Sequence, residues 1–261
     1  MLAMKKTVHS IRKAKISGQR IVMLTAYDYP TALILNQAEI DIILVGDTLG
    51  MVVLGYETTR DVTITDMIRH TSAVKRGNET CLIVSDLPYQ SDKTPELAVE
   101  NAKQLISVGA DAVKIEGSKT EIIGAIIKEG IPVMGHVGLL PQTTETFRVR
   151  GRKKKEANQI LEDAISLERA GCFAVVLECI PNPVAERITE SLSIPTIGIG
   201  AGAGCDGQIL VIHDLIGLFD RFRPTFAKQF TNVKKEILRA VKSYKFEVQQ
   251  GTFPDADHSY E

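Results

Sequence analysis

Short apolar runs that end in a polar or ionisable residue recur along the whole chain. They are IVMLTAYD ending at Asp28, DIILVGD at Asp47, CLIVSD at Asp86, AVKIE at Glu116, PVMGH at His136, CFAVVLE at Glu178, TIGIG ending in glycine, and QILVIHD ending at His213 and Asp214. Buried strands have no reason of their own to end this way, whereas parallel strands whose carboxyl ends converge on one site do. The pattern therefore predicts parallel β-strands with functional side chains at one common end.

The segments between these runs have the period of α-helices. TPELAVENAKQLISVGAD places apolar residues on one stripe, with Thr94 as the expected N-cap and Gly109 as the stop. EANQILEDAISLERAGC repeats the design with Ile160 and Leu167 facing inward and Gly171 at its end. TEIIGAIIKEGI and NPVAERITESLSI are shorter copies, and an apolar strand follows each of these helical segments within a few residues.

A strand–helix alternation repeated about eight times is typical of a parallel sheet buried on both faces. An open doubly wound sheet and a closed barrel both satisfy it. Eight strand candidates begin near Ile21, Asp41, Cys81, Ala112, Pro132, Cys172, Thr196 and Gln208. The chain has 261 residues, close to the roughly 250 of such a barrel. An open sheet would also leave polar ends unused on its outer strands. We predict an α/β fold, a (β/α)8 TIM barrel, with its chemistry at the C-terminal face.

No linker or change of composition divides the chain. We expect one domain over 1–261, with an N-terminal helical segment and with a C-terminal helix and polar tail over 232–261. Two insertions follow strands: 55–76, which includes the expected helix ITDMIRHTSAVKRG, and 139–155, which is polar and is a candidate lid over the barrel mouth.

Composition narrows the class of protein. The chain is 44% hydrophobic, enough for a full core, and its net charge of −1 gives no argument for a nucleic acid or an anionic membrane as partner. No apolar stretch suits a signal peptide or approaches the roughly 20 residues of a membrane span. Four scattered cysteines without a C-x-x-C pair suit a reduced interior. We expect a soluble cytoplasmic protein with small-molecule ligands.

Asp47, Asp86 and Glu116 stand at the ends of the second, third and fourth strands. Neighbouring strands lie about 4.8 Å apart, so the three carboxylates would repel one another unless a cation or shared protons neutralise them. Oxygen ligands select a hard cation, and magnesium is the typical one that keeps waters and binds substrate oxygens. The alternative is that each acid only caps the helix that follows.

Three further side chains are candidates for chemistry. Lys114 lies two residues before Glu116 and would face the same interior, where it could pair with Asp86 or bind a substrate carboxylate; charge pairing is favoured over a Schiff base. Glu178, two strands from the acids, is the candidate general base, with a structural ion pair as the alternative. His136 would either contact a substrate or be an ordinary core histidine.

Two other segments indicate a function less specifically. The glycine-rich GIGAGAGCDGQ lacks the first-strand position of a dinucleotide-binding motif, so backbone approach to a ligand is the better interpretation. The basic run is either a solvated surface or a site that attracts an anionic tail. It consists of Arg148, Arg150, Arg152, Lys153, Lys154 and Lys155.

Six motifs, in this order, resemble those of the ketopantoate hydroxymethyltransferase family: GDTLGMVVLGYETT, SDLPY, VKIEG, PVMGHVGLLPQ, LECIP and GIGAGAGCDGQILVIHD. The resemblance covers nearly the whole chain. It implies a (β/α)8 barrel that assembles as a homodecamer. It also implies transfer of a hydroxymethyl group from 5,10-methylenetetrahydrofolate to 3-methyl-2-oxobutanoate, giving 2-dehydropantoate in pantothenate biosynthesis through a magnesium-stabilised enolate.

The resemblance also implies roles for single residues. Asp47, Asp86 and Glu116 would hold Mg²⁺, and Glu178 would accept the proton. The keto acid would contact Asp47, Thr48, Asp86, Lys114 and His136. The family commonly has serine at the position of Thr48, and TETFRVRGR departs from its usual pattern after PQ. Two alternatives stay open: a related magnesium-dependent C–C lyase acting on 2-oxo acids, and a barrel that keeps the site only for binding or assembly.

Overall fold

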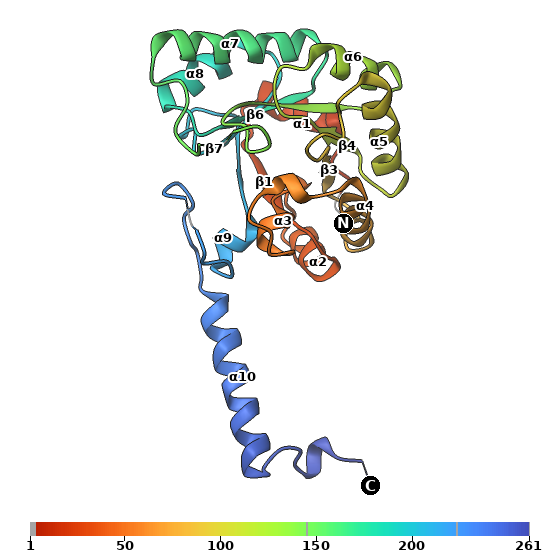
Figure 1. The fold of residues 1–261 in the computed structure, drawn as a ribbon, viewed down its shortest axis with the longest axis vertical. Helices are drawn as coiled ribbons and strands as arrows, with labels where there is room; N and C mark the ends of the chain where they lie inside the picture. Colours follow the sequence, from red (N-terminus) through yellow and green to blue (C-terminus); the bar gives the residue numbers. More distant parts are fainter. Residues whose placement is uncertain (1–3, 145, 223, 261) are drawn as a thin grey trace. The chain divides into compact units, whose positions relative to one another are not determined.

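Eight parallel strands form a closed barrel in chain order, in which β8 also pairs with β1 (Figure 1). The computed structural model describes residues 4–144, 146–222 and 224–260. The strands are β1 (Ile21–Thr25), β2 (Ile42–Val45), β3 (Leu82–Asp86), β4 (Ala112–Lys114), β5 (Val133–Gly138), β6 (Ala174–Glu178), β7 (Thr196–Ile199) and β8 (Gly207–Leu210). The predicted closed barrel is thus confirmed over the open sheet, and every strand begins within two residues of its predicted start.

Helices follow most of the strands. They are α1 (Val8–Ser17), α2 (Tyr29–Gln37), α3 (Leu49–Val52), α4 (Ile64–Arg76), α5 (Pro95–Ser107), α6 (Thr120–Lys128), α7 (Lys154–Arg169) and α8 (Asn182–Ser191), with a 3-10 turn η1 (Thr59–Asp61). Residues 200–206 lead directly from β7 into β8 as turns and bends, which agrees with the interpretation of this segment as a glycine-rich turn. Gly200 and Gly202 have φ of 62° and 79° there, which a right-handed helix does not accommodate.

The predicted polar strand ends are only partly confirmed. Asp86 and Glu178 are the last residues of β3 and β6, and His136 lies two residues before the end of β5. Four strands stop before the predicted residue: Asp47 and Glu116 lie two residues beyond β2 and β4, and β1 and β8 end three residues before Asp28 and His213. Asp28 is the N-cap of α2 and accepts from the Thr31 N–H, and His213 and Asp214 lie in a short helix, α9 (Ile212–Ile216).

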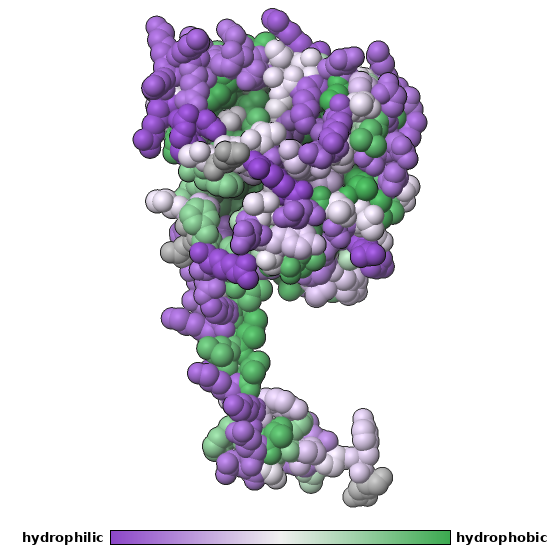
Figure 2. All heavy atoms as spheres, viewed as in Figure 1, coloured by the Kyte–Doolittle hydropathy of each residue, from purple (hydrophilic) through white to green (hydrophobic). Residues whose placement is uncertain are grey.

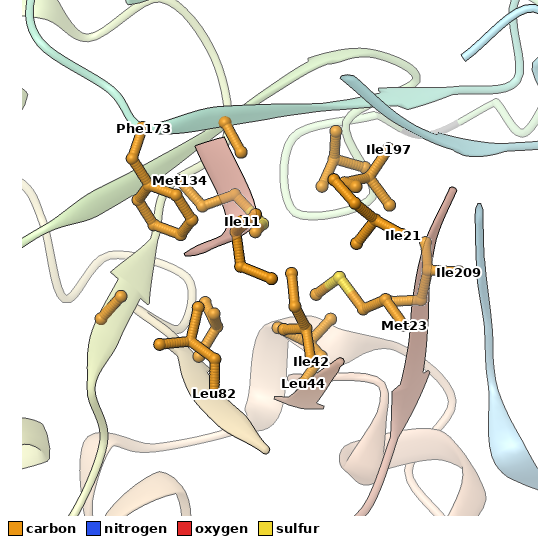
Figure 3. Packing of buried hydrophobic residues seen from close by; sticks show 14 of the residues in the cluster. Ile11, Ile21, Met23, Ile42, Leu44, Leu82, Met134, Phe173, Ile197 and Ile209 are labelled. Atoms are coloured by element: carbon orange, nitrogen blue, oxygen red, sulfur yellow. The ribbon is translucent and has the colours of Figure 1, made fainter. Parts of the chain in front are cut away.

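Helix α1 supplies apolar side chains to one end of the barrel core. Its N-cap Thr7 and the third helical residue, Ser10, form a reciprocal capping box, which fixes where the helix starts. Ile11 then packs among strand residues such as Ile21, Leu82 and Met134 (Figure 3). The predicted N-terminal helical segment is confirmed, and its role is to close the core.

Contacts divide the chain into two compact units, Met1–Val211 and Ile212–Glu261. The second unit contains α9, α10 (Val233–Gln250) and the turn η2 (Ala256–His258). No residue of α10 is buried, and Figure 2 shows hydrophobic side chains along this helix. The single-domain organisation stays a prediction. Among the described residues, no helix has the length and apolar character needed to cross a membrane.

A substitution of Gly138, the last residue of β5, can test how tightly the barrel rim is packed. Its φ is 99°, and an added Cβ would lie 2.3 Å from the backbone oxygen of Glu178. We expect Gly138→Ala to lower the free energy of unfolding by about 2 kcal/mol, measured by urea denaturation.

Gly124 inside α6 is the matched control, because an added Cβ meets nothing within 4 Å there. Gly124→Ala should raise the free energy of unfolding by about 0.5–1 kcal/mol. Equal effects of the two substitutions would contradict the close contact at Gly138.

Candidate active site

The acids of the second and third strands meet Lys114 of β4 at the carboxyl end of the barrel. Parallel pairing sets Asp86 directly opposite Lys114, and the lysine Nζ donates to Oδ1 of Asp86 at 2.8 Å. The other carboxylate oxygen of Asp86 accepts from the backbone N–H of Asp47 at 3.0 Å. All three residues are at most 5% exposed. The predicted charge pairing of Lys114 with Asp86 is therefore present in the structure.

These charges are unbalanced. When all three are ionised, Asp47, Asp86 and Glu116 set three buried carboxylates against the single ammonium of Lys114, which leaves two negative charges uncompensated. Burial, and then the charge of Asp86, raise the pKa of Asp47 to about 7. Burial also raises the pKa of Glu116 well above its usual value. Burial alone would lower the pKa of Lys114, but Asp86, Glu116 and Asp47 raise it above its usual range.

Gln142, which follows β5, bridges two of the acids. Its Nε2 donates to Oδ2 of Asp47 at 2.8 Å and to the backbone oxygen of Leu87 at 3.0 Å. Its backbone N–H donates to Oε2 of Glu116 at 3.0 Å. Gln142 is 2% exposed, so these bonds form away from water. One residue therefore supplies donors to both carboxylates whose pKa is raised.

Arg60 of η1 fixes the connection that carries Gln142. Its Nε donates to the backbone oxygen of Gln142 at 3.0 Å, and its Nη2 donates to that of Thr144 at 2.9 Å. The two insertions that the sequence predicted are thus joined to each other at the barrel rim. That the segment 139–155 closes as a lid stays a prediction, and its residue 145 lies outside the described residues.

His136 of β5 lies between two carboxylates. Its Nε2 is 3.2 Å from Oε2 of Glu178, and its Nδ1 is 3.7 Å from Oε1 of Glu116. Neither contact has hydrogen-bond geometry, so within the described part of the chain both ring nitrogens lack a hydrogen-bond partner. Burial lowers the pKa of His136, which keeps the ring neutral near pH 7. A buried polar ring without partners is costly, and a bound ligand or water is what usually compensates it.

Thr48 lies at the same rim. Its Oγ1 is 2.7 Å from the phenol oxygen of Tyr27, and it precedes α3 without capping that helix through its side chain. The structure thus brings every predicted site residue to one end of the barrel. The alternative that the acids cap helices is not what the structure shows, because Thr48, Thr94 and Lys119 stand at the N-caps of α3, α5 and α6.

The donor set suits magnesium in its chemistry. Buried carboxylate oxygens with uncompensated negative charge are what a hard divalent cation requires. Among the described residues, however, no three His, Cys, Asp or Glu side chains converge closely enough to hold one metal ion together. Magnesium usually takes one or two protein carboxylates directly and keeps several waters, so the acids fit it without direct contact from all three.

Sequence reasoning missed Gln142, Arg60 and Tyr27. Gln142 ends the motif PVMGHVGLLPQ, and a polar residue directly after Pro141 in an otherwise apolar run was the available indication. No sequence signal indicated Arg60 or Tyr27, because their hydrogen-bond partners lie far away in the sequence or are backbone atoms.

A closed βα barrel that gathers buried acids, a lysine and a histidine at the carboxyl ends of its strands is the architecture of a barrel enzyme. Residues 5–256 match the model of one family, described as ketopantoate hydroxymethyltransferase. The chain belongs to this family.

Curated relatives agree along the full length. A 3-methyl-2-oxobutanoate hydroxymethyltransferase of Moorella thermoacetica is 53% identical over 262 residues, covering 97% of both chains. One from Syntrophus aciditrophicus is 50% identical, covering 98% of this chain and 97% of the relative. One from Ignicoccus hospitalis is also 50% identical, covering 96% and 97%.

Solved structures with a similar fold are much more distant in sequence. A phosphoenolpyruvate phosphomutase from Streptomyces platensis subsp. rosaceus superposes with a TM-score of 0.65 at 13% identity, covering 98% of this chain and 92% of that one. A phosphonopyruvate hydrolase, in complex with oxalate and Mg²⁺, gives 0.64 at 11% identity, covering 97% and 93%. These likenesses show the fold alone.

Gln142 provides a test of how the acids are held. Gln142→Leu removes the side-chain donor to Asp47 and to the Leu87 carbonyl while keeping the backbone bond to Glu116. We expect the free energy of unfolding of the metal-free protein to fall by about 1–3 kcal/mol, measured by urea denaturation in EDTA. Gln37→Leu, an exposed position on α2, is the control and should change it by less than about 0.5 kcal/mol. Indistinguishable variants would show that Gln142 does not support the acids.

Proposed function

We propose that this chain transfers a hydroxymethyl group from 5,10-methylenetetrahydrofolate to 3-methyl-2-oxobutanoate, giving 2-dehydropantoate for pantothenate biosynthesis. The observation that carries the proposal is the family match over residues 5–256, in which the chain's own Asp47, Asp86, Lys114, Glu116 and Glu178 lie at one barrel rim. Overall, the keto acid, the folate and one water yield the hydroxymethyl product and tetrahydrofolate.

Asp47, Asp86 and Glu116 would hold a magnesium ion, in part through water. When bound, this ion would draw electron density from the ketone of the keto acid and so acidify the C3–H bond. The barrel buries more carboxylates than the charge of Lys114 can neutralise, which favours the binding of a cation. Asp47 and Thr48 follow β2 directly and are placed to contact the same substrate.

Glu178 is the proton acceptor. Its side chain is 17% exposed, against 3% for Asp86 and 4% for Glu116, so it is the acid that an incoming substrate reaches most easily. The C3–H bond breaks, the proton moves to a Glu178 oxygen, and the electron pair forms the enolate. His136 lies next to this carboxylate and can donate to it or to the substrate. Lys114 supplies a fixed positive charge near the developing anion.

The enolate carbon then bonds to the one-carbon unit of the folate as one of that unit's two C–N bonds breaks and its electron pair returns to nitrogen. Water replaces the second nitrogen and supplies the hydroxyl group, and tetrahydrofolate leaves with the proton taken from C3 and one proton from water on its two nitrogens. Because the one-carbon unit must approach C3 of the keto acid, the folate has to reach the same rim.

We also propose that the protein is a cytoplasmic homodecamer. Support comes from α10, where Ile237, Val241, Tyr244 and Val248 repeat at helical spacing and are each at least 46% exposed. A stripe of this kind suits burial against another subunit.

Product formation from 3-methyl-2-oxobutanoate and 5,10-methylenetetrahydrofolate tests the activity. Turnover should disappear with EDTA and return with added magnesium, because the buried acids need a cation. Cleavage of 2-oxo acids without any folate dependence would favour the lyase instead. Tight keto-acid binding without turnover in magnesium would favour a binding-only barrel.

Glu178→Gln tests the proton acceptor. The amide keeps the shape but cannot take the proton, so we expect kcat to fall by roughly 10²–10⁴-fold. Binding of magnesium and of the keto acid, measured by calorimetry, should change little. The control Glu190→Gln alters an exposed glutamate of α8 and should leave kcat unchanged. If Glu178→Gln lost binding and turnover together, Glu178 would be a ligand or a structural residue.

A further inference from the structure

A cavity of about 530 Å³ lies between the connection that follows β5 and helix α7. None of the roles assigned above uses it. Its walls include Gly138, Leu140, Thr144, Arg150, Glu156 and Gln159. A cavity of this volume is within the usual range for small-molecule sites.

Backbone hydrogen bonds fasten the cavity wall to the end of β6. Gly138 pairs in register with Glu178, and the next residue, Leu139, donates its N–H to the Glu178 oxygen at 2.9 Å. At the other end of the wall, the N–H of Arg150 donates to the oxygen of Cys179 at 2.8 Å. The cavity is therefore built onto the residue that we propose as the proton acceptor and onto its neighbour.

Side-chain hydrogen bonds also hold the same wall in position. Arg60 holds the backbone oxygens of Gln142 and Thr144, and Arg150 Nη2 donates to Oγ1 of Thr144 at 2.8 Å. These bonds hold the wall in place without any ligand. A second substrate seated in the cavity would therefore lie against a wall whose backbone is bonded to Glu178 and Cys179.

The lining suits a flat heterocycle with polar edges. Leu140 and Ile160 offer apolar contact, while Thr144 and Gln159 offer hydrogen-bonding groups. Glu156 contributes a carboxylate that is only loosely paired, at 3.6 Å from Arg148 and 3.8 Å from Arg150. A carboxylate can accept from both N–H groups of a 2-amino-pyrimidinone edge, such as that of a pterin.

The basic run continues from this cavity. It places six cations within 148–155, and among the described residues the ion pairs of this run go only to Glu156. Lys154 and Lys155 begin α7, where positive charge opposes the helix dipole. The lysines therefore do not stabilise the helix, and their positive charge suits the binding of an anionic partner.

We propose that the cavity binds the pterin of the folate co-substrate and that Lys153, Lys154 and Lys155 bind its anionic glutamate tail. This inference rests on the proposed function and adds to it where the second substrate lies.

Gln159→Trp fills the cavity from an exposed position on α7. We expect affinity for tetrahydrofolate, measured by calorimetry, to fall at least tenfold, with affinity for 3-methyl-2-oxobutanoate within twofold of wild type. Glu162→Trp, on the same helix but outside the lining, is the control and should retain tetrahydrofolate binding. Unchanged binding by Gln159→Trp, or equal loss in both variants, would overturn the assignment.

The tail is tested by replacing Lys153, Lys154 and Lys155 with glutamine. Affinity for tetrahydrofolate triglutamate should fall about tenfold, with at most a twofold change for the monoglutamate. A control that replaces three exposed lysines elsewhere, Lys13, Lys93 and Lys128, should bind both as wild type does. A triglutamate affinity equal to that of the control would refute the tail site. Wild-type protein that neither binds tetrahydrofolate nor forms product would instead refute the proposed function.

Discussion

The ion pair between Lys114 and Asp86 is the interaction on which the site depends. Parallel register sets the two residues opposite each other, and both side chains lie almost out of contact with water. Removing one partner from a buried pair typically costs about 3–5 kcal/mol, because the remaining charge is left unpaired. The pair makes it physically tolerable to bury Asp47 and Glu116 nearby. The charge that remains is then available for a cation, which a fully neutralised cluster would not attract.

The connection after β5 joins the two halves of the site. Its first residues bond to the end of β6, Gln142 bonds to Asp47 and Glu116, and Arg150 returns to Cys179. Cys179 holds a φ of 50°, an uncommon value for a residue with a side chain. A backbone turn at this point directs the chain away immediately after Glu178. Asp47, Glu116 and the backbone of Glu178 are thus all contacted by one continuous segment rather than by separate loops.

Local patterns predicted the barrel and its polar rim, because strand period and helix caps depend on neighbours in sequence. Thr94 capping α5 and Glu178 ending β6 are examples. The pattern failed where a polar residue could serve either a strand end or a cap, as at Asp28. It also failed to find Gln142 and Arg60, because their contacts depend on the three-dimensional path of two irregular insertions. Only the folded chain shows that these insertions meet.

The barrel alone does not determine the reaction. Proteins 11–15% identical to this chain share its fold, and their names include a phosphonopyruvate hydrolase and a 2,3-dimethylmalate lyase. Acids and a lysine at a barrel rim can stabilise an enolate whichever bond is made or broken. What separates a transferase from a lyase is room for a second substrate beside the enolate. The segment between β5 and α7 is where this chain provides such room, so substrate choice should depend on that segment more than on the strands.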